Sequence, residues 1–258
     1  RDRSPSRGLG DVYKRQDFVV LDNLQDLNVT DVFYKGKLVD RNAPIRVKTC
    51  GRALKHTVHL DKVKAEQFVL PIGKKKTHVI GINPSQITTE DLAVSLQPAA
   101  NYVPTDGYSK VAAVERHHNT GKIGVAVAKG YGIRNGAVAS SVSHDSHNII
   151  VIGDNDRDMA LAVDEIIRTQ GGYTVVENGE VFETLPLPIM GLMSDAGFES
   201  VNETLGRMIK KAHEMGVPAD IEPFITLSFL ALPVIPTLRI TPRGLCLLTA
   251  KGPEILQE

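Results

Sequence analysis

The sequence predicts an α+β fold, in which mixed and antiparallel β-sheets are covered by helices and preceded by part of a small β domain. Asn178-Gly179, between two apolar runs, is the strongest hairpin signal in the chain. The four Ile and Val residues at 149–152 indicate a fully buried strand. Apolar residues at helical spacing indicate an amphipathic helix over Ser200–Met215. Hairpins combined with a few helices indicate an α+β fold whose sheets are covered by helices.

The composition indicates a globular protein without an obvious charged partner. The 258 residues suffice for one large or two small domains, and 42% hydrophobic with 23% charged residues is an ordinary balance. Lys+Arg and Asp+Glu are equal at 30 each, so we expect neither nucleic acid nor a membrane as partner. Two cysteines argue against a disulfide framework and, with no apolar run long enough to span a bilayer, predict a cytoplasmic protein.

The first 16 residues, RDRSPSRGLGDVYKRQ, are polar, basic and without periodicity. They fit a disordered natural arm or a non-native leader joined to a truncated gene, and we expect the leader, with the natural protein continuing upstream. The chain then divides into a remnant of a small β domain and a linker at 17–75, and an α+β domain at 76–258.

The first half of the chain is predicted to be mainly β. A hairpin turns at Lys35-Gly36, and it is too small to bury its own surface, so it should pack on something else. Residues 58–68 are mixed and charged, and suit a short helix or a linker. The predicted strands are Phe18–Leu21, Asn28–Tyr34, Lys37–Val39, Thr77–Ile82, Thr88–Leu96, Val111–Arg116 and Ile123–Ala128.

The second half mixes helices and strands. Residues 137–142 fit a helix or a strand, whereas Met159–Arg168 is a helix capped within Asp154–Asp156. Strands Tyr173–Val176 and Val181–Leu185 form the hairpin. Ser194 or Asp195 is expected to cap the helix that follows. The tail through Pro236 is apolar, and no element is predicted after it.

The chemically dense stretch is the string at 140–148, SSVSHDSHN, between a glycine-rich loop and the buried strand. Loops that enter strong strands often carry functional groups. Its histidines and aspartate suit metal ligation, acid–base chemistry or substrate binding, or they merely satisfy one another's hydrogen bonds. A charged cluster at 115–118 fits a solvated turn or a pocket wall. The substrate-pocket candidates are His144, Asp145, Ser146, His147, Asn148, Glu115 and Arg116, and no catalytic residue or metal ligand is assigned.

Other motifs give weaker evidence for a functional site. The glycine-rich runs at 121–124 and 130–136 match neither phosphate-binding fingerprint, so structural turns are expected. His56, His59, His78 and His213 are isolated, and are expected to be structural or exposed.

Several segments together resemble the C-terminal domain of adenine deaminases, in the amidohydrolase superfamily. The similarity covers about residues 17–245, and the hairpin at 18–39 resembles the small β domain that accompanies amidohydrolase barrels. After Gly244 the match fades, and Cys246–Glu258 is expected to be divergent or frame-shifted. The segments are Val-Glu-Arg-His-His at 114–118, Gly-Lys-Ile-Gly at 121–124, Gly-Tyr-Gly at 130–132, Gly-Ala-Val-Ala-Ser-Ser at 136–141, Ser-His-Asp-Ser-His-Asn at 143–148, Gly-Gly at 171–172, Leu-Pro-Leu-Pro-Ile-Met-Gly-Leu-Met-Ser-Asp at 185–195 and Leu-Ser-Phe-Leu-Ala-Leu-Pro-Val-Ile-Pro at 227–236.

The resemblance implies an enzyme that converts adenine and water to hypoxanthine and ammonia, in purine salvage or breakdown. Its metals, usually manganese or iron, lie in an N-terminal (β/α)₈ barrel that is missing from this chain. We therefore expect the chain alone to be inactive, and the full enzyme to bind adenine and form a homo-oligomer, a dimer. The loop His144–Asn148 is expected to reach the barrel's mouth and shape the adenine pocket.

Two alternatives stay open. The chain is a non-catalytic module for packing and subunit association, which exposed apolar patches on the hairpin and on 223–236 would favour. Alternatively, it is a self-sufficient metallohydrolase built on His144, Asp145 and His147.

Overall fold

The computed structural model describes residues 17–43, 50–73, 76–105 and 107–256. Its internal contacts divide the chain into two compact units, Arg1–Thr49 and Cys50–Glu258. The leader expected at 1–16 lies outside the described residues.

The first unit is a three-stranded antiparallel sheet of β1 (Phe18–Leu21), β2 (Val29–Tyr34) and β3 (Lys37–Leu38), in that order. Lys35 and Gly36 both have positive φ, 52° and 73°, as a tight two-residue hairpin requires. The predicted hairpin is confirmed. Much of its apolar surface stays exposed, at Phe18, Val19, Val20, Leu24, Leu27, Val29, Tyr34, Leu38 and Val39.

The second unit is built on one eight-stranded sheet in the order β11-β10-β8-β9-β6-β7-β4-β5. Only β4 and β7 are parallel, and every other pair is antiparallel, so the predicted α+β class with mixed and antiparallel sheets is confirmed. Within the described residues no sheet closes into a barrel. The strands are β4 Thr77–Ile82, β5 Thr89–Val94, β6 Tyr108–Val114, β7 Ile123–Lys129, β8 Gly136–Ser140, β9 Ile149–Gly153, β10 Gly172–Glu177 and β11 Glu180–Pro186.

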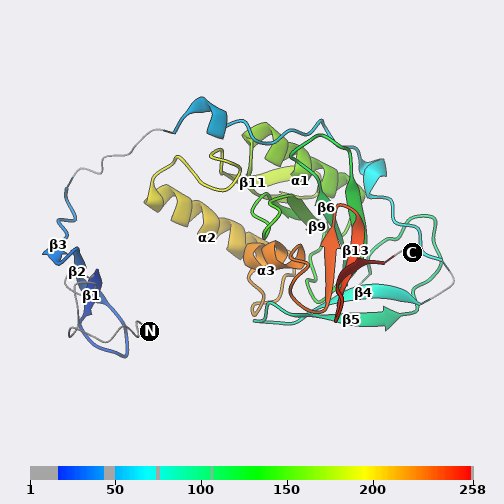
Figure 1. Ribbon diagram of the computed structural model, residues 1–258, viewed down its shortest axis with the longest axis horizontal. Helices are drawn as coiled ribbons and strands as arrows, with labels where there is room; N and C mark the ends of the chain where they lie inside the picture. The colour runs from blue at the N-terminus through cyan, green and yellow to red at the C-terminus, as the bar shows by residue number, and fades with distance from the viewer. Residues whose placement is uncertain (1–16, 44–49, 74–75, 106, 257–258) are drawn as a thin grey trace. The chain divides into compact units, whose positions relative to one another are not determined.

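Helices cover both faces of this sheet (Figure 1). The α1 helix (Asp156–Thr169) packs on one face, and α2 (Phe198–Glu214) with α3 (Pro223–Leu230) on the other. The strand β9 shows why its sequence is continuously apolar. Ile149 and Val151 join the α1 side of the core, while Ile150 and Ile152 join the α2–α3 side. Residues 137–142, open between helix and strand, contain most of β8, which is likewise buried on both faces.

The segment 50–73 runs along the second unit with two short 3₁₀ turns, η1 (Arg52–Leu54) and η2 (Ala65–Phe68). Its apolar residues Val58, Val63 and Phe68 are buried in the α1 side of the core. The contacts therefore divide the chain after Thr49, whereas the sequence suggested a boundary at residue 75.

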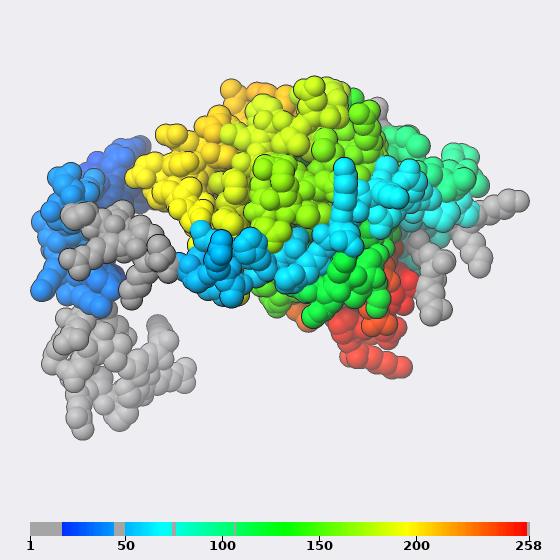
Figure 2. All heavy atoms as spheres, turned by 90° about the horizontal axis from the view of Figure 1, so that it is seen from above, coloured from blue at the N-terminus to red at the C-terminus, as the bar shows by residue number. Residues whose placement is uncertain are grey.

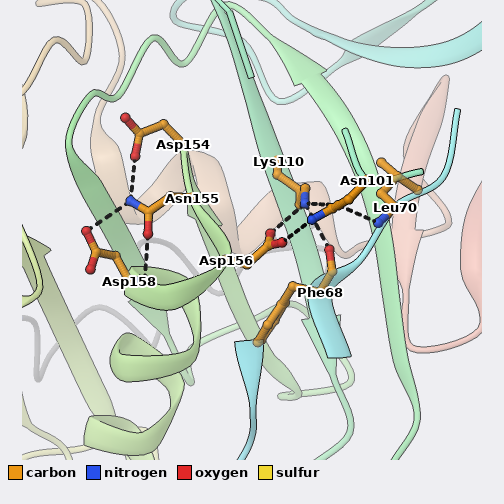
Figure 3. A network of polar contacts seen from close by, with 8 residues as sticks. All are labelled: Phe68, Leu70, Asn101, Lys110, Asp154, Asn155, Asp156 and Asp158. Atoms are coloured by element: carbon orange, nitrogen blue, oxygen red, sulfur yellow. Dashed lines mark hydrogen bonds and ion pairs between the residues drawn. The ribbon is translucent and has the colours of Figure 1, made fainter. Parts of the chain in front are cut away.

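A buried lysine ties this segment to the sheet and to α1 (Figure 3). Lys110 of β6 is 1% exposed, and its Nζ lies 2.5 Å from Asp156 Oδ1, 2.9 Å from Asn101 Oδ1 and 3.0 Å from the Phe68 carbonyl. Burial lowers the pKa of Lys110, and the Asp156 carboxylate opposes that shift. All three ammonium donors thus have partners, the condition under which a buried charge is tolerated.

The N-termini of α1 and α2 test the predicted N-cap residues. Asn155, within the predicted 154–156 stretch, caps α1 by accepting a hydrogen bond from the Asp158 amide at 2.9 Å. The prediction for α2 is wrong, because its N-cap is Gly197, which has no side chain to cap with. Asp195 instead pairs with Lys55 at 2.5 Å, and Ser194 Oγ accepts from the Ala196 amide. None of the described helices is long and apolar enough to cross a membrane.

The C-terminal elements were not predicted. The α3 helix is apolar around nearly its whole circumference because Phe224, Leu227 and Leu230 lie in the core. The stretch 223–236 is therefore mainly core, and not an exposed patch; Ile225 and Val234 are its exposed large apolar residues. Beyond it, β12 (Leu238–Thr241), β13 (Gly244–Thr249) and β14 (Gly252–Ile255) form an antiparallel sheet.

This small sheet belongs to the domain. Cys246, expected to begin a divergent or frame-shifted end, is 1% exposed, and Leu245 joins the main core. The sheet packs against β7 so closely that a Cβ on Gly124 would lie 2.0 Å from the Thr241 carbonyl oxygen.

Candidate functional site

The register of two neighbouring strands brings the two predicted clusters together. Val114, the last residue of β6, pairs with Ile149, the first residue of β9. Glu115 and Arg116 therefore leave the sheet beside Asn148, where the polar loop 143–148 enters it. Residues about thirty positions apart in sequence thus share one end of the sheet.

Arg116 is a buried clamp and not part of a solvated turn. Its side chain is 1% exposed, and Nε donates to the carbonyl of His147. The remaining donors reach the Met190 carbonyl at 3.0 Å and the Thr57 carbonyl at 3.1 Å. Burial lowers the pKa of Arg116 to about 10, so the guanidinium stays charged at neutral pH. Its partners are neutral oxygens from three segments, which it holds together.

Gly191 lets the neighbouring segment approach this clamp. Its φ is +71°, and a Cβ there would lie 2.8–2.9 Å from three atoms of the Arg116 guanidinium. Ser141 Oγ fixes the same glycine by donating to its carbonyl at 2.6 Å. Met190 and Gly191, just after the Leu-Pro-Leu-Pro string, therefore position Arg116 through backbone contacts.

Glu115 organises the turn next to the loop. One carboxylate oxygen accepts from the amides of His117 and His118, and the other from the amide and hydroxyl of Thr120. Burial raises its pKa, but these hydrogen bonds outweigh burial and lower the pKa to about 2. The turn directs His117 Nε2 to the Ser146 carbonyl at 2.8 Å, where the ring nitrogen is the donor. Glu115 is therefore occupied as a structural acceptor, and contacts the loop through His117.

The loop has an exposed rim. The side chain of Asp145 is 84% exposed and that of His144 is 44% exposed, and Ser146 is also exposed. The α3 helix supports His144. The His144 amide donates a hydrogen bond to the Ser228 carbonyl at 3.1 Å, and the ring centroids of His144 and Phe229 lie 4.8 Å apart. The rim thus exposes an imidazole and a carboxylate at the surface of this unit.

The base of the loop contains polar atoms without partners. Among the described residues, Ser143 Oγ, His147 Nδ1, Asn148 Oδ1 and Ser228 Oγ are buried and lack a hydrogen bond. Burial and the nearby Arg116 charge lower the pKa of His147. Since buried polar groups are nearly always paired in folded proteins, a gathering of four around one loop marks a place where a polar ligand or another chain segment is expected.

The loop does not fit a metal. Among the described residues no group of three or more His, Cys, Asp or Glu side chains is arranged to hold an ion. Asp145 points to solvent at 3.7 Å from His144 Nδ1, while His147 Nδ1 is buried. The histidines and aspartate are thus divided between rim and base, which argues against the self-sufficient metallohydrolase.

Sequence reasoning missed Ser228 and Phe229, which support the loop from α3. The available signal was a single serine within an otherwise apolar run, since a buried hydroxyl needs a reason. The weaker motifs behave as structural parts: His78 Nδ1 contacts Asp91 at 2.8 Å, and His213 Nδ1 contacts the Val217 carbonyl at 2.9 Å. In the glycine-rich run 130–136, a Cβ on Gly132 would meet the Gly216 carbonyl oxygen at 3.0 Å, so that run is a packed turn.

Fold and site together define an α+β accessory domain: a two-faced sheet that presents one polar, incompletely paired loop. The family model for the adenine deaminase C-terminal domain matches residues 86–251, beyond the point where the resemblance was expected to fade. This chain belongs to the adenine deaminase C-terminal domain family.

Curated relatives agree with this assignment. An adenine deaminase of Desulfitobacterium hafniense (strain Y51) is 50% identical over 231 residues, covering 89% of this chain and 40% of the relative. One from Nitratidesulfovibrio vulgaris (strain DP4) is 45% identical over 235 residues, covering 89% and 41%. Adenine deaminase 2 of Carboxydothermus hydrogenoformans is 40% identical over 237 residues, covering 90% and 42%. The chain spans about two fifths of the length of these relatives.

Proposed function

We propose that this chain is the C-terminal part of an adenine deaminase, which hydrolyses adenine to hypoxanthine and ammonia. The family match and relatives named adenine deaminase support the activity. We further propose that the chain alone is inactive, that the enzyme is cytoplasmic and dimeric, and that its metals, manganese or iron, are held by residues outside this chain. The division of His144, Asp145 and His147 between rim and base supports the last point.

The role proposed for this domain is to complete the substrate pocket with the loop His144–Asn148. One observation carries this proposal: buried polar atoms of Ser143, His147, Asn148 and Ser228 lack partners beneath an exposed rim. Adenine offers ring nitrogens and an amino group that such atoms can pair with. A loop that closes over a substrate also excludes water and orients the base. Glu115 and Arg116 act as supports, because their polar groups are occupied by the chain itself.

The test uses a chimera in which this chain replaces the corresponding C-terminal part of the Desulfitobacterium hafniense relative. We expect the chimera to produce hypoxanthine from adenine, and the separate 258-residue chain with manganese to produce none. Within the chimera, His147→Ala and Ser228→Ala are expected to lower kcat/KM for adenine at least tenfold, because hydrogen bonds to substrate are lost.

The matched controls are His78→Ala and Ser85→Ala, which remove the same side chains elsewhere on the domain. They should leave kcat/KM within about twofold, because neither lies near the loop. Metal content, measured for every variant, should stay unchanged. Equal kinetics for the loop and control variants would refute the pocket role, and hypoxanthine formed by the separate chain would refute its inactivity.

The second candidate is a non-catalytic module for packing and subunit association. It is favoured by the exposed apolar residues of the first unit, including Phe18, Val19 and Leu38. Phe18 and Phe33 stack at 4.5 Å on that sheet and give it a rigid aromatic surface. Sedimentation of the wild-type chain and of the Phe18→Ser/Val19→Ser variant tests this association role. A wild-type dimer that the substitutions dissociate would support it. A monomer in both forms would exclude self-association of this chain alone.

A further inference from the structure

A second feature of the domain is a cavity of about 430 Å³ beside the C-terminal sheet. It lies between the β6–β7 turn and the β12–β14 sheet, and Figure 2 shows the red C-terminal residues beside the green middle of the chain. Its volume is in the range of small-molecule sites, roughly 300–1,000 Å³. The lining residues are Glu115, Thr120, Lys122, Pro233, Thr241, Pro242, Arg243, Cys246, Pro253 and Ile255.

Two cationic side chains of this cavity, the Lys122 ammonium and the Arg243 guanidinium, have no hydrogen-bond or ion-pair partner among the described residues. Their hydrogen bonds are made by the backbone, with Glu115, Thr120 and Thr241. The one carboxylate of the lining, on Glu115, accepts four hydrogen bonds from its own turn. Both of its oxygens are thereby engaged, and because the two cations outnumber the one carboxylate, the lining carries net positive charge.

The rest of the lining is mainly apolar. Pro233, Pro242 and Pro253 supply rigid rings, and Cys246 and Ile255 supply the sulfur and aliphatic surface of the same sheet. Proline rings lose little conformational freedom on binding, so such a wall suits a flat or compact apolar body. The position of the wall is fixed, because Gly124 of β7 touches the Thr241 carbonyl without room for a Cβ.

We propose that this cavity binds an organic phosphate monoester, with the phosphate between Lys122 and Arg243 and the apolar body against the proline-lined wall. An Arg and a Lys match the roughly two negative charges of a phosphate monoester at neutral pH. The Arg can donate bidentate hydrogen bonds, and the Lys acts as a point charge. The inference is independent of the adenine deaminase role proposed above, because it uses other side chains than the loop His144–Asn148.

The test is calorimetric titration of the 258-residue chain with three probes: adenosine 5′-monophosphate, adenosine and inorganic phosphate. We expect saturable 1:1 binding of the monophosphate, at least tenfold tighter than either other probe, because only this probe uses both halves of the site. In the double variant Lys122→Ala/Arg243→Ala its Kd should rise at least tenfold. Both residues are exposed, so the fold should persist, as circular dichroism will verify.

The matched control is Lys62→Ala/Lys210→Ala, which removes two cations that are 84% and 80% exposed elsewhere. It changes the net charge equally and should leave the Kd unchanged. Three outcomes would overturn the proposal: no saturable binding of the monophosphate, equal weakening by both double variants, or inorganic phosphate binding as tightly as the monophosphate.

Discussion

The guanidinium of Arg116 donates a hydrogen bond to the carbonyl of His147, and this contact links the end of β6 to the loop that enters β9. The same side chain binds the carbonyls of Thr57 and Met190. A charged group thereby holds four chain segments, counting its own, at the edge of the polar loop. Loop geometry and domain stability should consequently depend on one residue.

Replacing Arg116 with Met tests this dependence. The variant removes the hydrogen bonds to three carbonyls in a partly buried environment, and each acceptor left unpaired costs about 1–3 kcal/mol when it is buried. We expect the free energy of unfolding to fall by about 3 kcal/mol in urea denaturation. Arg168→Met is the control, because Arg168 is 69% exposed and Glu165 is its one ion-pair partner among the described residues, so its loss should be below about 1 kcal/mol. Equal losses would show that Arg116 is not a clamp.

Gly191→Ala should destabilise the domain by a second route. The new Cβ would meet the Arg116 guanidinium at 2.8–2.9 Å, in addition to the strain of a φ of +71°. Gly121→Ala separates the two costs, because Gly121 has φ +68° and nothing within 4 Å of a new Cβ. We expect about 1 kcal/mol for Gly121→Ala and at least about 2 kcal/mol for Gly191→Ala, measured by thermal denaturation. Similar melting temperatures for both would exclude the steric cost.

Lys110 and Asp156 should behave as a coupled buried pair. Lys110→Met leaves a partly buried carboxylate without its counter-ion and the Phe68 carbonyl without its donor, so we expect a loss of about 3–5 kcal/mol. Lys110→Met/Asp156→Leu removes both charges and should recover part of that loss. Urea denaturation of the two single variants and the double variant completes the cycle. Additive losses would show that the two residues do not interact, contrary to their 2.5 Å separation.

Glu115 predicts a specific acid dependence. Its pKa falls from 4.5 to about 2 on folding, so the unfolded chain binds a proton more readily. The stability that it contributes is present above about pH 4.5, and is lost as the pH falls toward about 2. Glu115→Gln should therefore lower stability at pH 6, and the difference from the wild type should shrink between pH 4.5 and pH 2. A constant difference across denaturant curves in that window would contradict the assignment.

The local pattern of residues was sufficient for most of the secondary structure. The ends of the predicted strands of the main sheet lie within three residues of those of β4, β5, β6, β7 and β9, and the two amphipathic stretches are α1 and α2. The Asn178-Gly179 turn also joins β10 to β11 as expected. Alternation and helical spacing are set by which face of an element is buried, and that information lies in neighbouring residues.

The C-terminal elements could not be predicted from these local patterns. The α3 helix carries apolar residues on its buried and its exposed sides alike, so it has no polar stripe and no helical period. The sheet β12–β14 has short strands whose burial depends on packing against β7, far away in sequence. The burial of these C-terminal elements is recognised only when the surfaces that cover them are known.

The candidate site, too, was predictable from the sequence only in part. The string 143–148 and the cluster at 115–118 were recognisable from their polar density, but their proximity follows from the pairing of Val114 with Ile149. Only the tertiary structure shows that Arg116 is buried under Gly191, or that Ser228 of α3 lies beneath His144. A side chain's role depends on its solvation and its partners, and these are supplied by residues distant in sequence, because folding brings them within bonding distance.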